Sequence, residues 1–281
     1  MIPKVIHYLW LSDEKPSDVE QCLATWKEKL VDYEIKEWNR TNFPYQDFVW
    51  TREAYSAKKW AFVTDFFRLW VLDNYGGIYM DADVTMTGTF DSFLNQPMFI
   101  GVEATCKLEA HVIGAVKGHP FIHNCLCYYN NRHFINEDGS LDMMPIPNII
   151  TRVFMEMYHY NGKLVHFDGV PLKFSDLKVY PDTYFTIRTF DGNNICYHNG
   201  FGSWRDNTTP QNPLMEDVVC DYYVRKFLCN TIGQTHRGLR KLLYLLMPIG
   251  LHALRCRRSL EIKNNKKVNS VDFSGIDFEF H

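Results

Sequence analysis

The chain has 281 residues, of which 46% are hydrophobic and 22% are charged, and its formal net charge is −3. Its length suits one large α/β domain, or such a domain with an appendage, and the hydrophobic share supports a substantial core. Because a slightly negative chain has no overall attraction to nucleic acid, we expect no nucleic-acid partner. The eight cysteines show no paired metal-binding spacing, which favours a reduced, cytoplasmic setting. No apolar run is long enough to cross a bilayer.

Two strands are predicted near the N-terminus, over residues 4–10 and 33–38. The first is too apolar for an exposed edge, so we expect it in the interior of the sheet. A capping box led by Ser17 begins the helix that joins the two strands. Ligands of open α/β sheets bind beyond the carboxyl ends of the strands, where Trp10 and Asn39 lie. The alternative for Trp10 is a core position at the end of a strand.

A buried helix is predicted over residues 57–75, after an irregular stretch at 40–56. Its side chains are apolar nearly all round, which is typical of a helix that is covered on every side. Asp65 and Arg68 are three residues apart and therefore share one face of this helix. Buried charges are stable only when they are paired or bind a ligand. The pair is thus a structural ion pair, a ligand contact, or both.

Two glycines and a short strand follow this helix. The glycines at 76–77 suit a left-handed helix end, and residues 78–81 have the pattern of a strand. If the extended conformation continues, the side chains of Tyr79, Asp81 and Asp83 point the same way. Aligned carboxylates at the end of a strand, close to a charged helix face, suit a divalent metal that holds an anionic ligand.

This combination of residues resembles the DXD-containing sugar transferases of glycosyltransferase family 32. That group includes yeast-type initiating mannosyltransferases, bacterial capsule and lipopolysaccharide transferases, and the catalytic domains of glucosylating toxins. The resemblance is strong over residues 1–104 and returns at 196–205, where His198, Ser203 and Trp204 match a late histidine followed by Ser-Trp. It implies an α/β fold of the GT-A type, a Rossmann-like mixed sheet flanked by helices.

The resemblance also implies roles for the site residues. The residues expected to bind the donor are Trp10, Asn39, Asp65, Arg68, Tyr79, Asp81, Ser203 and Trp204. Those expected to hold a divalent metal, Mn²⁺ or Mg²⁺, are Asp81, Asp83 and His198. Catalytic roles are expected for Asp65, Arg68, Asp81 and Asp83. Such a metal would neutralise the leaving diphosphate as a Lewis acid, while Ser203 and Trp204 donate hydrogen bonds to the diphosphate.

The middle of the chain matches the family poorly. Strands are predicted over residues 98–102 and 112–116. Glu103 follows the first of them and His111 precedes the second, which makes both further site candidates. The polar loop at residues 136–147 has a composition that suits one wall of an acceptor cleft, and an amphipathic helix follows it.

The C-terminal part changes character. We predict a GT-A catalytic domain over residues 1–232 and a helical, basic extension over 233–281. Within the extension, residues 236–258 place basic side chains on both sides of an apolar centre. This pattern fits an interfacial anchor on an anionic membrane surface, or a helix packed on the core with solvated basic ends. The first option predicts a cytoplasmic enzyme held on the inner face of the cell membrane.

The predicted function is metal-dependent transfer of a sugar from a nucleotide-diphosphate sugar, with a UDP-sugar favoured, to a glycan or lipid-linked acceptor. The resemblance implies retention of the anomeric configuration and a place in surface polysaccharide biosynthesis, such as that of capsule or lipopolysaccharide. One alternative is a haloacid-dehalogenase-type phosphatase with Asp81 as its nucleophile, whose last motif is mimicked by Glu216, Asp217 and Asp221. The other is a protein that binds nucleotide-sugars without turnover.

Overall fold

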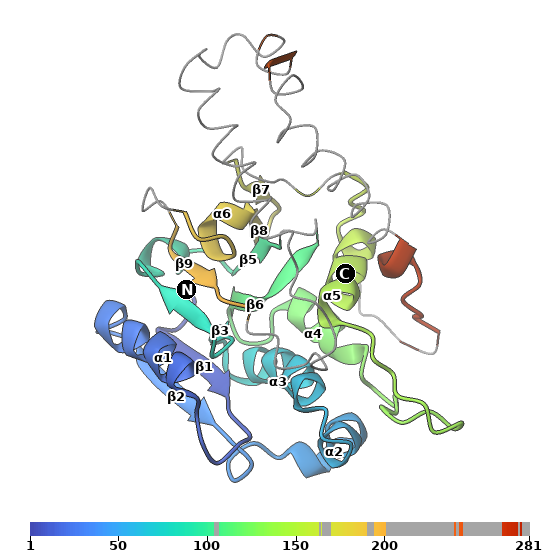
Figure 1. Cartoon of the computed structure of the whole chain (residues 1–281). Coiled ribbons are helices and arrows are strands. Elements are labelled where there is room, and N and C mark those ends of the chain that lie inside the picture. The colour runs from blue at the N-terminus through green and yellow to red at the C-terminus, as the bar shows by residue number, and fades with distance from the viewer. Residues whose placement is uncertain are drawn as a thin grey trace.

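A seven-stranded mixed sheet forms the centre of the protein (Figure 1). The computed structural model describes residues 1–103, 107–162, 164, 170–189, 194–200, 239, 242–243, 266–274 and 276. The strands of the sheet are β1 (Val5–Leu9), β2 (Glu34–Trp38), β3 (Gly77–Met80), β5 (Met98–Val102), β6 (Leu108–Ala115), β7 (Leu172–Lys173) and β8 (Leu177–Tyr180). Their spatial order is β2-β1-β3-β6-β5-β8-β7. The predicted α/β class, a Rossmann-like mixed sheet with flanking helices, is confirmed.

Strand direction gathers the predicted ligand contacts at one edge of the sheet. β1 runs parallel to both β2 and β3, which confirms its interior position. β6 runs antiparallel to β3 and to β5. The carboxyl ends of β1, β2, β3 and β5 therefore meet the amino end of β6 at a single edge. This is the edge where open α/β sheets bind their ligands.

Helices cover both faces of the sheet, and each face buries its own apolar cluster (Figure 1). One cluster packs α1 (Ser17–Lys29), α6 (Asp182–Phe185) and the small sheet of β4 (Val84–Met86) with β9 (Cys196–His198). The other packs α2 (Val49–Ser56), α3 (Trp60–Tyr75), α4 (Pro120–Cys127) and α5 (Ile146–Met157). Short 3-10 helices lie at Tyr45–Asp47 and Asp91–Phe93. No helix in the described part of the chain is both long and apolar enough to cross a membrane.

Two local predictions are wrong. The stretch before residue 57 is not irregular, because it contains α2, and the single helix expected over 57–75 begins only at Trp60. The break lies at Lys58, whose φ of 57° is left-handed, and the Lys59 N–H closes α2 on the Ala54 carbonyl. The predicted capping box led by Ser17 is also absent, because Pro16 is the N-cap of α1 and no described side chain caps this helix.

The two glycines between α3 and β3 set the direction in which the site faces. Gly76 has a φ of 66° and Gly77 a φ of 105°, which are conformations that L side chains rarely adopt. A Cβ on Gly77 would also lie 2.7 Å from the Val5 carbonyl oxygen of β1. His7 lies beside this turn and donates from Nε2 to the Gly76 carbonyl at 3.0 Å, while its Nδ1 accepts from the Trp38 indole at 3.1 Å. The turn makes α3 antiparallel to β3, so the first half of α3 lies at the ligand edge.

The predicted boundary between residues 1–232 and 233–281 lies in a part of the chain that the structure mostly leaves undescribed. The helical, basic segment at 236–258 also falls outside the described residues, except for positions 239, 242 and 243. Both remain predictions from the sequence.

Candidate functional site

Arg68 is the centre of a buried charge network at the ligand edge. Its Nη2 donates to Asp65 Oδ1 at 2.8 Å, and its Nη1 lies 3.4 Å from Asp81 Oδ1 and donates to the Ala110 carbonyl. The guanidinium carbon lies 4.8 Å from the centre of the Tyr79 ring. The structural ion pair between Asp65 and Arg68 is thus present. Because Arg68 also reaches Asp81, the pair belongs to the same cluster as the DXD carboxylates.

Asp65 is largely buried. Its side chain accepts from the backbone N–H of Ile146, at the start of α5, and from Arg68. Burial raises the pKa of Asp65 to about 6, although the charge of Arg68 opposes this rise. A carboxylate fixed by a guanidinium in this way is oriented to accept hydrogen bonds from a sugar hydroxyl.

The chain turns directly after β3, so the extended conformation that would align Asp81 with Asp83 does not continue. The Val84 N–H bonds to the Asp81 carbonyl at 3.1 Å, which closes a tight turn that contains Asp83. The next three residues form β4, which pairs with β9 so that Val84 lies opposite His198. Pairing between distant strands, and not alternation along one strand, brings the carboxylates and the histidine together.

Asp81, Asp83 and His198 form a cluster whose potential ligand atoms all lie within 4.8 Å of one another. The Tyr79 hydroxyl donates to Asp81 Oδ1, and His198 Nε2 lies 3.0 Å from Asp83 Oδ1. Burial alone would lower the pKa of His198, but the Asp83 and Asp81 carboxylates outweigh it and raise this pKa to about 9. Such a surplus of negative charge is what a divalent cation would neutralise.

The donor set fits the predicted metal. Carboxylate oxygens suit Mg²⁺ and Mn²⁺, and an imidazole nitrogen favours the transition ion of the two. Each of the three side chains is partly exposed, so a ligand can reach the cluster from solvent. The structure therefore brings together the three predicted metal ligands, and it adds Arg68 and Tyr79 as direct neighbours of Asp81.

Trp10 and Asn39 lie side by side at the carboxyl ends of β1 and β2. The Trp10 N–H bonds to the Trp38 carbonyl at 2.8 Å, which places Trp10 next to Asn39. Trp10 is half-buried and is not a core residue, and its indole N–H donates to the Glu14 carbonyl at 3.1 Å. The side-chain oxygen of Asn39 accepts from the backbone N–H of Thr41 at 2.8 Å. Their predicted contact with a nucleotide base remains a prediction.

Ser203 and Trp204 lie outside the described residues, and so do Glu216, Asp217 and Asp221 of the phosphatase alternative. Of the further candidates, Glu103 pairs with Lys107 at 3.1 Å and stays at the margin of the site. His111 lies inside β6, which begins at Leu108 and not after His111 as predicted. Its ring stacks on His198 with centroids 4.3 Å apart and planes 10° from parallel.

Glu109 was not predicted as part of the site. It is fully buried and lies 3.0 Å from His111 Nε2. The signal in the sequence that could have identified it is an acidic residue two positions from a histidine, directly before the strand predicted over 112–116.

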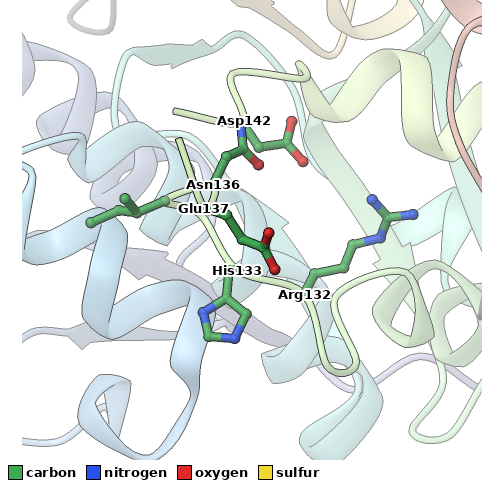
Figure 2. Close-up of a pocket in the computed structure, with 6 residues that line it drawn as sticks. Arg132, His133, Asn136, Glu137 and Asp142 are labelled. Atoms are coloured by element: carbon green, nitrogen blue, oxygen red, sulfur yellow. The ribbon is translucent and has the colours of Figure 1, made fainter. Parts of the chain in front are cut away.

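A polar hollow that shares no residue with this cluster lies in the loop between α4 and α5, and Figure 2 shows its lining side chains. The cavity of about 340 Å³ is lined by Arg132, His133, Ile135, Asn136, Glu137 and Asp142. Glu53 of α2 holds one side of this loop by accepting from the backbone N–H groups of Phe134 and Ile135, at 2.8 and 3.0 Å. At its C-terminal end the loop continues to Ile146, whose backbone N–H bonds to Asp65. The hollow and the charge network are therefore connected through one short segment.

Comparison with known proteins identifies the class of this site. Residues 16–100 match the family model described as glycosyltransferase sugar-binding region containing DXD motif. This segment contains Asp65, Arg68, Asp81 and Asp83. Residues 16–100 are therefore similar to the DXD-containing glycosyltransferases, which agrees with the predicted resemblance to glycosyltransferase family 32.

Several curated yeast proteins are similar to the chain. Inositol phosphoceramide mannosyltransferase 3 of Schizosaccharomyces pombe is 30% identical over 43% of this chain and 35% of its own length. Mannosyl phosphorylinositol ceramide synthase CSH1 of Saccharomyces cerevisiae is 26% identical over 81% of this chain and 61% of its own length. The chain thus spans between about one third and three fifths of these two relatives. A solved structure titled PaToxG Glycosyltransferase has a TM-score of 0.44 and 20% identity, over 55% of this chain and 68% of that one.

Proposed function

We propose that this protein is a metal-dependent glycosyltransferase that moves a sugar from a nucleotide-diphosphate sugar to a glycan or lipid-linked acceptor, with retention of configuration. One observation carries the proposal. Ligand atoms of Asp81, Asp83 and His198 converge within 4.8 Å, beside a buried arginine that contacts both Asp65 and Asp81. A nucleotide-diphosphate needs positive charge and donors at its phosphates, and a sugar needs a fixed acceptor for its hydroxyls. Arg68 and a bound cation would supply the positive charge, and Asp65 would supply the acceptor, all at one edge of the sheet.

The chain's own groups have separable roles in this proposal. Asp81, Asp83 and His198 would hold the cation, which would supply Lewis-acid stabilisation of the leaving diphosphate. The Ala110 carbonyl and Asp65 already hold the Arg68 side chain in one position. Its guanidinium can therefore stabilise the diphosphate without first having to rearrange. Asp65 accepts from a donor-sugar hydroxyl and fixes the orientation of the ring.

The names of the relatives narrow the donor and the acceptor that we propose. These names refer to mannosyl transfer and to an inositol phosphoceramide. Mannose is therefore the first donor sugar to test, and a phosphoinositol-type glycolipid is the first acceptor. A setting in surface polysaccharide synthesis gains no support from those names and stays a proposal. A UDP-sugar is the donor that we favour, because Trp10 and Asn39 suit a pyrimidine such as uracil, and a GDP-sugar is the alternative.

The experiment that tests this function is donor hydrolysis by the purified protein. UDP- and GDP-sugars would be incubated with Mn²⁺ or with EDTA, and the released nucleotide diphosphate would be measured. We expect one donor to be hydrolysed only with metal. The Asp83→Ala variant should abolish the reaction, whereas Asp138→Ala, which removes an exposed carboxylate, should leave it intact.

Two other results would each point elsewhere. Tight binding of a donor with neither hydrolysis nor transfer to any acceptor would indicate the nucleotide-sugar-binding protein. Hydrolysis of a phosphomonoester by the native protein, lost in the Asp81→Asn variant, would favour the phosphatase alternative. When a product forms, NMR of its anomeric proton tests the proposed retention directly.

A further inference from the structure

A buried glutamate and histidine lie directly behind the proposed metal ligand His198. His111 stacks on His198 with their ring centroids 4.3 Å apart and an interplanar angle of 10°. On its other side, His111 Nε2 lies 3.0 Å from Glu109 Oε2, which is an ion-pair distance, although Nε2 makes no hydrogen bond of good geometry among the described residues. Thr186 donates its hydroxyl to the same oxygen of Glu109 and also to the Val102 carbonyl, the latter at 3.0 Å. These contacts form a continuous line from α6 and β6 to the metal cluster.

Glu109 is costly to bury in this place. Its side chain is completely inaccessible to solvent, and its Oε1 has no hydrogen-bond partner among the described residues. The carboxyl group packs against the backbone of Gly101, where even an added Cβ would lie 2.5 Å from Oε1. A buried carboxylate with one unpaired oxygen destabilises a fold unless positive charge lies close by. The cluster of Asp81, Asp83 and His198 is where such charge would reside.

We propose that Glu109 and His111 are positioning residues for the metal site. His111 holds the His198 ring flat and facing Asp83, and Glu109 fixes His111 while adding negative charge behind the cation. Groups that orient a ligating histidine, and their charge, commonly set metal affinity as strongly as some ligands do. This inference rests on the proposed metal site, but it concerns residues that do not themselves reach the metal.

The test is the affinity of the metal-free protein for Mn²⁺, measured by electron paramagnetic resonance titration without any donor. Glu109→Gln keeps the shape and the Thr186 contact but removes the charge, and we expect it to weaken Mn²⁺ binding about tenfold. Thr186→Val, which removes one hydroxyl, is a milder second variant for the case that Glu109→Gln does not fold. We expect it to weaken binding about threefold, because Glu109 remains but is less fixed.

The matched control is Asp73→Asn. Asp73 is also a carboxylate with one buried oxygen that has no partner in the described part of the chain, and it pairs with His123 at 3.2 Å on the contact between α3 and α4. It should lower the melting temperature in EDTA and leave the Mn²⁺ affinity unchanged. Equal Mn²⁺ affinity in the native protein and in folded Glu109→Gln or Thr186→Val would overturn the inference while leaving the metal site standing. Absence of Mn²⁺ binding by the native protein would overturn both the metal site and this inference.

Discussion

At the scale of single residues, the site is recognisable by buried charges that do not add to the stability of the fold. Arg68 and Asp65 lie on a helix whose other buried positions are nearly all apolar. A buried ion pair seldom stabilises a protein more than apolar side chains of the same size would. The presence of this pair on such a helix is therefore in keeping with the ligand-binding role that we propose for it.

The first prediction concerns the shape of the Arg68 side chain. Arg68→Lys keeps the positive charge but cannot reach Asp65, Asp81 and the Ala110 carbonyl at once, because an ammonium lacks the planar fork. We expect donor turnover to fall about 100-fold and unfolding free energy to fall by about 1–3 kcal/mol, from the unpaired buried carbonyl. Donor hydrolysis and urea denaturation measure the two effects.

Its control is Arg52→Lys, on the surface of α2, where the exposed arginine donates to the Gln46 carbonyl at 2.8 Å. Donor turnover and unfolding free energy should both stay within error of the native protein there, because exposed polar contacts contribute little. A fully active Arg68→Lys enzyme would show that point charge alone suffices at this position.

The second prediction uses the buried imidazole of His7. Burial lowers the pKa of His7 to about 4, and the ring is neutral because Nδ1 accepts from Trp38. The unfolded chain, with a histidine pKa near 6.5, binds the proton more readily, so unfolding is favoured as pH falls from about 6.5 to 4. The loss amounts to about 3 kcal/mol across this window and is absent above it.

Denaturation curves at pH 7.0, 6.0 and 5.0 measure this slope. In His7→Gln the amide can still accept and donate, and the part of the slope due to His7 should vanish. The control is His159→Asn, at an exposed left-handed position that asparagine tolerates, and it should keep the native slope. Identical slopes in all three proteins would exclude His7 as the source.

At the scale of elements, the sequence predicts what depends on local pattern. The strand at residues 4–10, the apolar helix and the glycine turn are all visible in periodicity and in residue type. The break at Lys58 is not, because a left-handed lysine carries no composition signal. Nor is the pairing of β4 with β9, which joins segments more than a hundred residues apart and places His198 beside Asp83. For that histidine, the family resemblance supplied what local pattern could not.

The third prediction tests the glycine turn. A Cβ at Gly77 would meet the Val5 carbonyl oxygen at 2.7 Å in addition to the cost of a φ of 105°. We expect Gly77→Ala to lower the unfolding free energy by about 3 kcal/mol or more. Gly118→Ala is a milder case, because its φ of 67° lies in the left-handed region that L residues can adopt and no described atom lies within 4 Å of its Cβ, so it should cost about 1 kcal/mol. Equal losses would show that backbone strain, and not the contact with β1, makes Gly77 necessary.

The fourth prediction concerns the loop between α4 and α5. Carboxylates and amides around a hollow are suited to sugar hydroxyls, and the segment leads to Ile146, which contacts Asp65. We expect the double variant Glu137→Gln, Asp142→Asn to raise the acceptor KM about tenfold, while donor hydrolysis without acceptor stays unchanged. Steady-state transfer with varied acceptor separates the two. A parallel loss of donor hydrolysis would mean that the loop supports the fold of the site and does not bind the acceptor.

At the scale of the whole molecule, the order of the strands explains why residues from five separate segments meet. The switch from the parallel strands β2, β1 and β3 to the antiparallel β6 brings Ala110 and His111 to the end of β3. The Asp81 N–H bonds to the His111 carbonyl at 2.9 Å, which ties the DXD turn to β6. Topology of this kind cannot be read from a single sequence, because it depends on pairings that composition does not specify.

The fifth prediction concerns residues 236–258, whose basic and apolar composition suits an anionic lipid surface. The protein should sediment with vesicles that contain phosphatidylserine. The double variant Arg255→Gln, Arg257→Gln should weaken this binding about thirtyfold, since each basic residue near such a surface contributes about 1 kcal/mol and about 1.4 kcal/mol is a factor of ten. Lys27→Gln, Lys29→Gln on α1 removes the same charge from a surface helix and should have little effect. Binding should also weaken at high salt, because screening shortens the reach of the surface potential. Two outcomes would favour the alternative in which this segment packs on the protein and its basic ends are only solvated. One is equal affinity for neutral phosphatidylcholine vesicles, and the other is an equal loss of vesicle binding in both double variants.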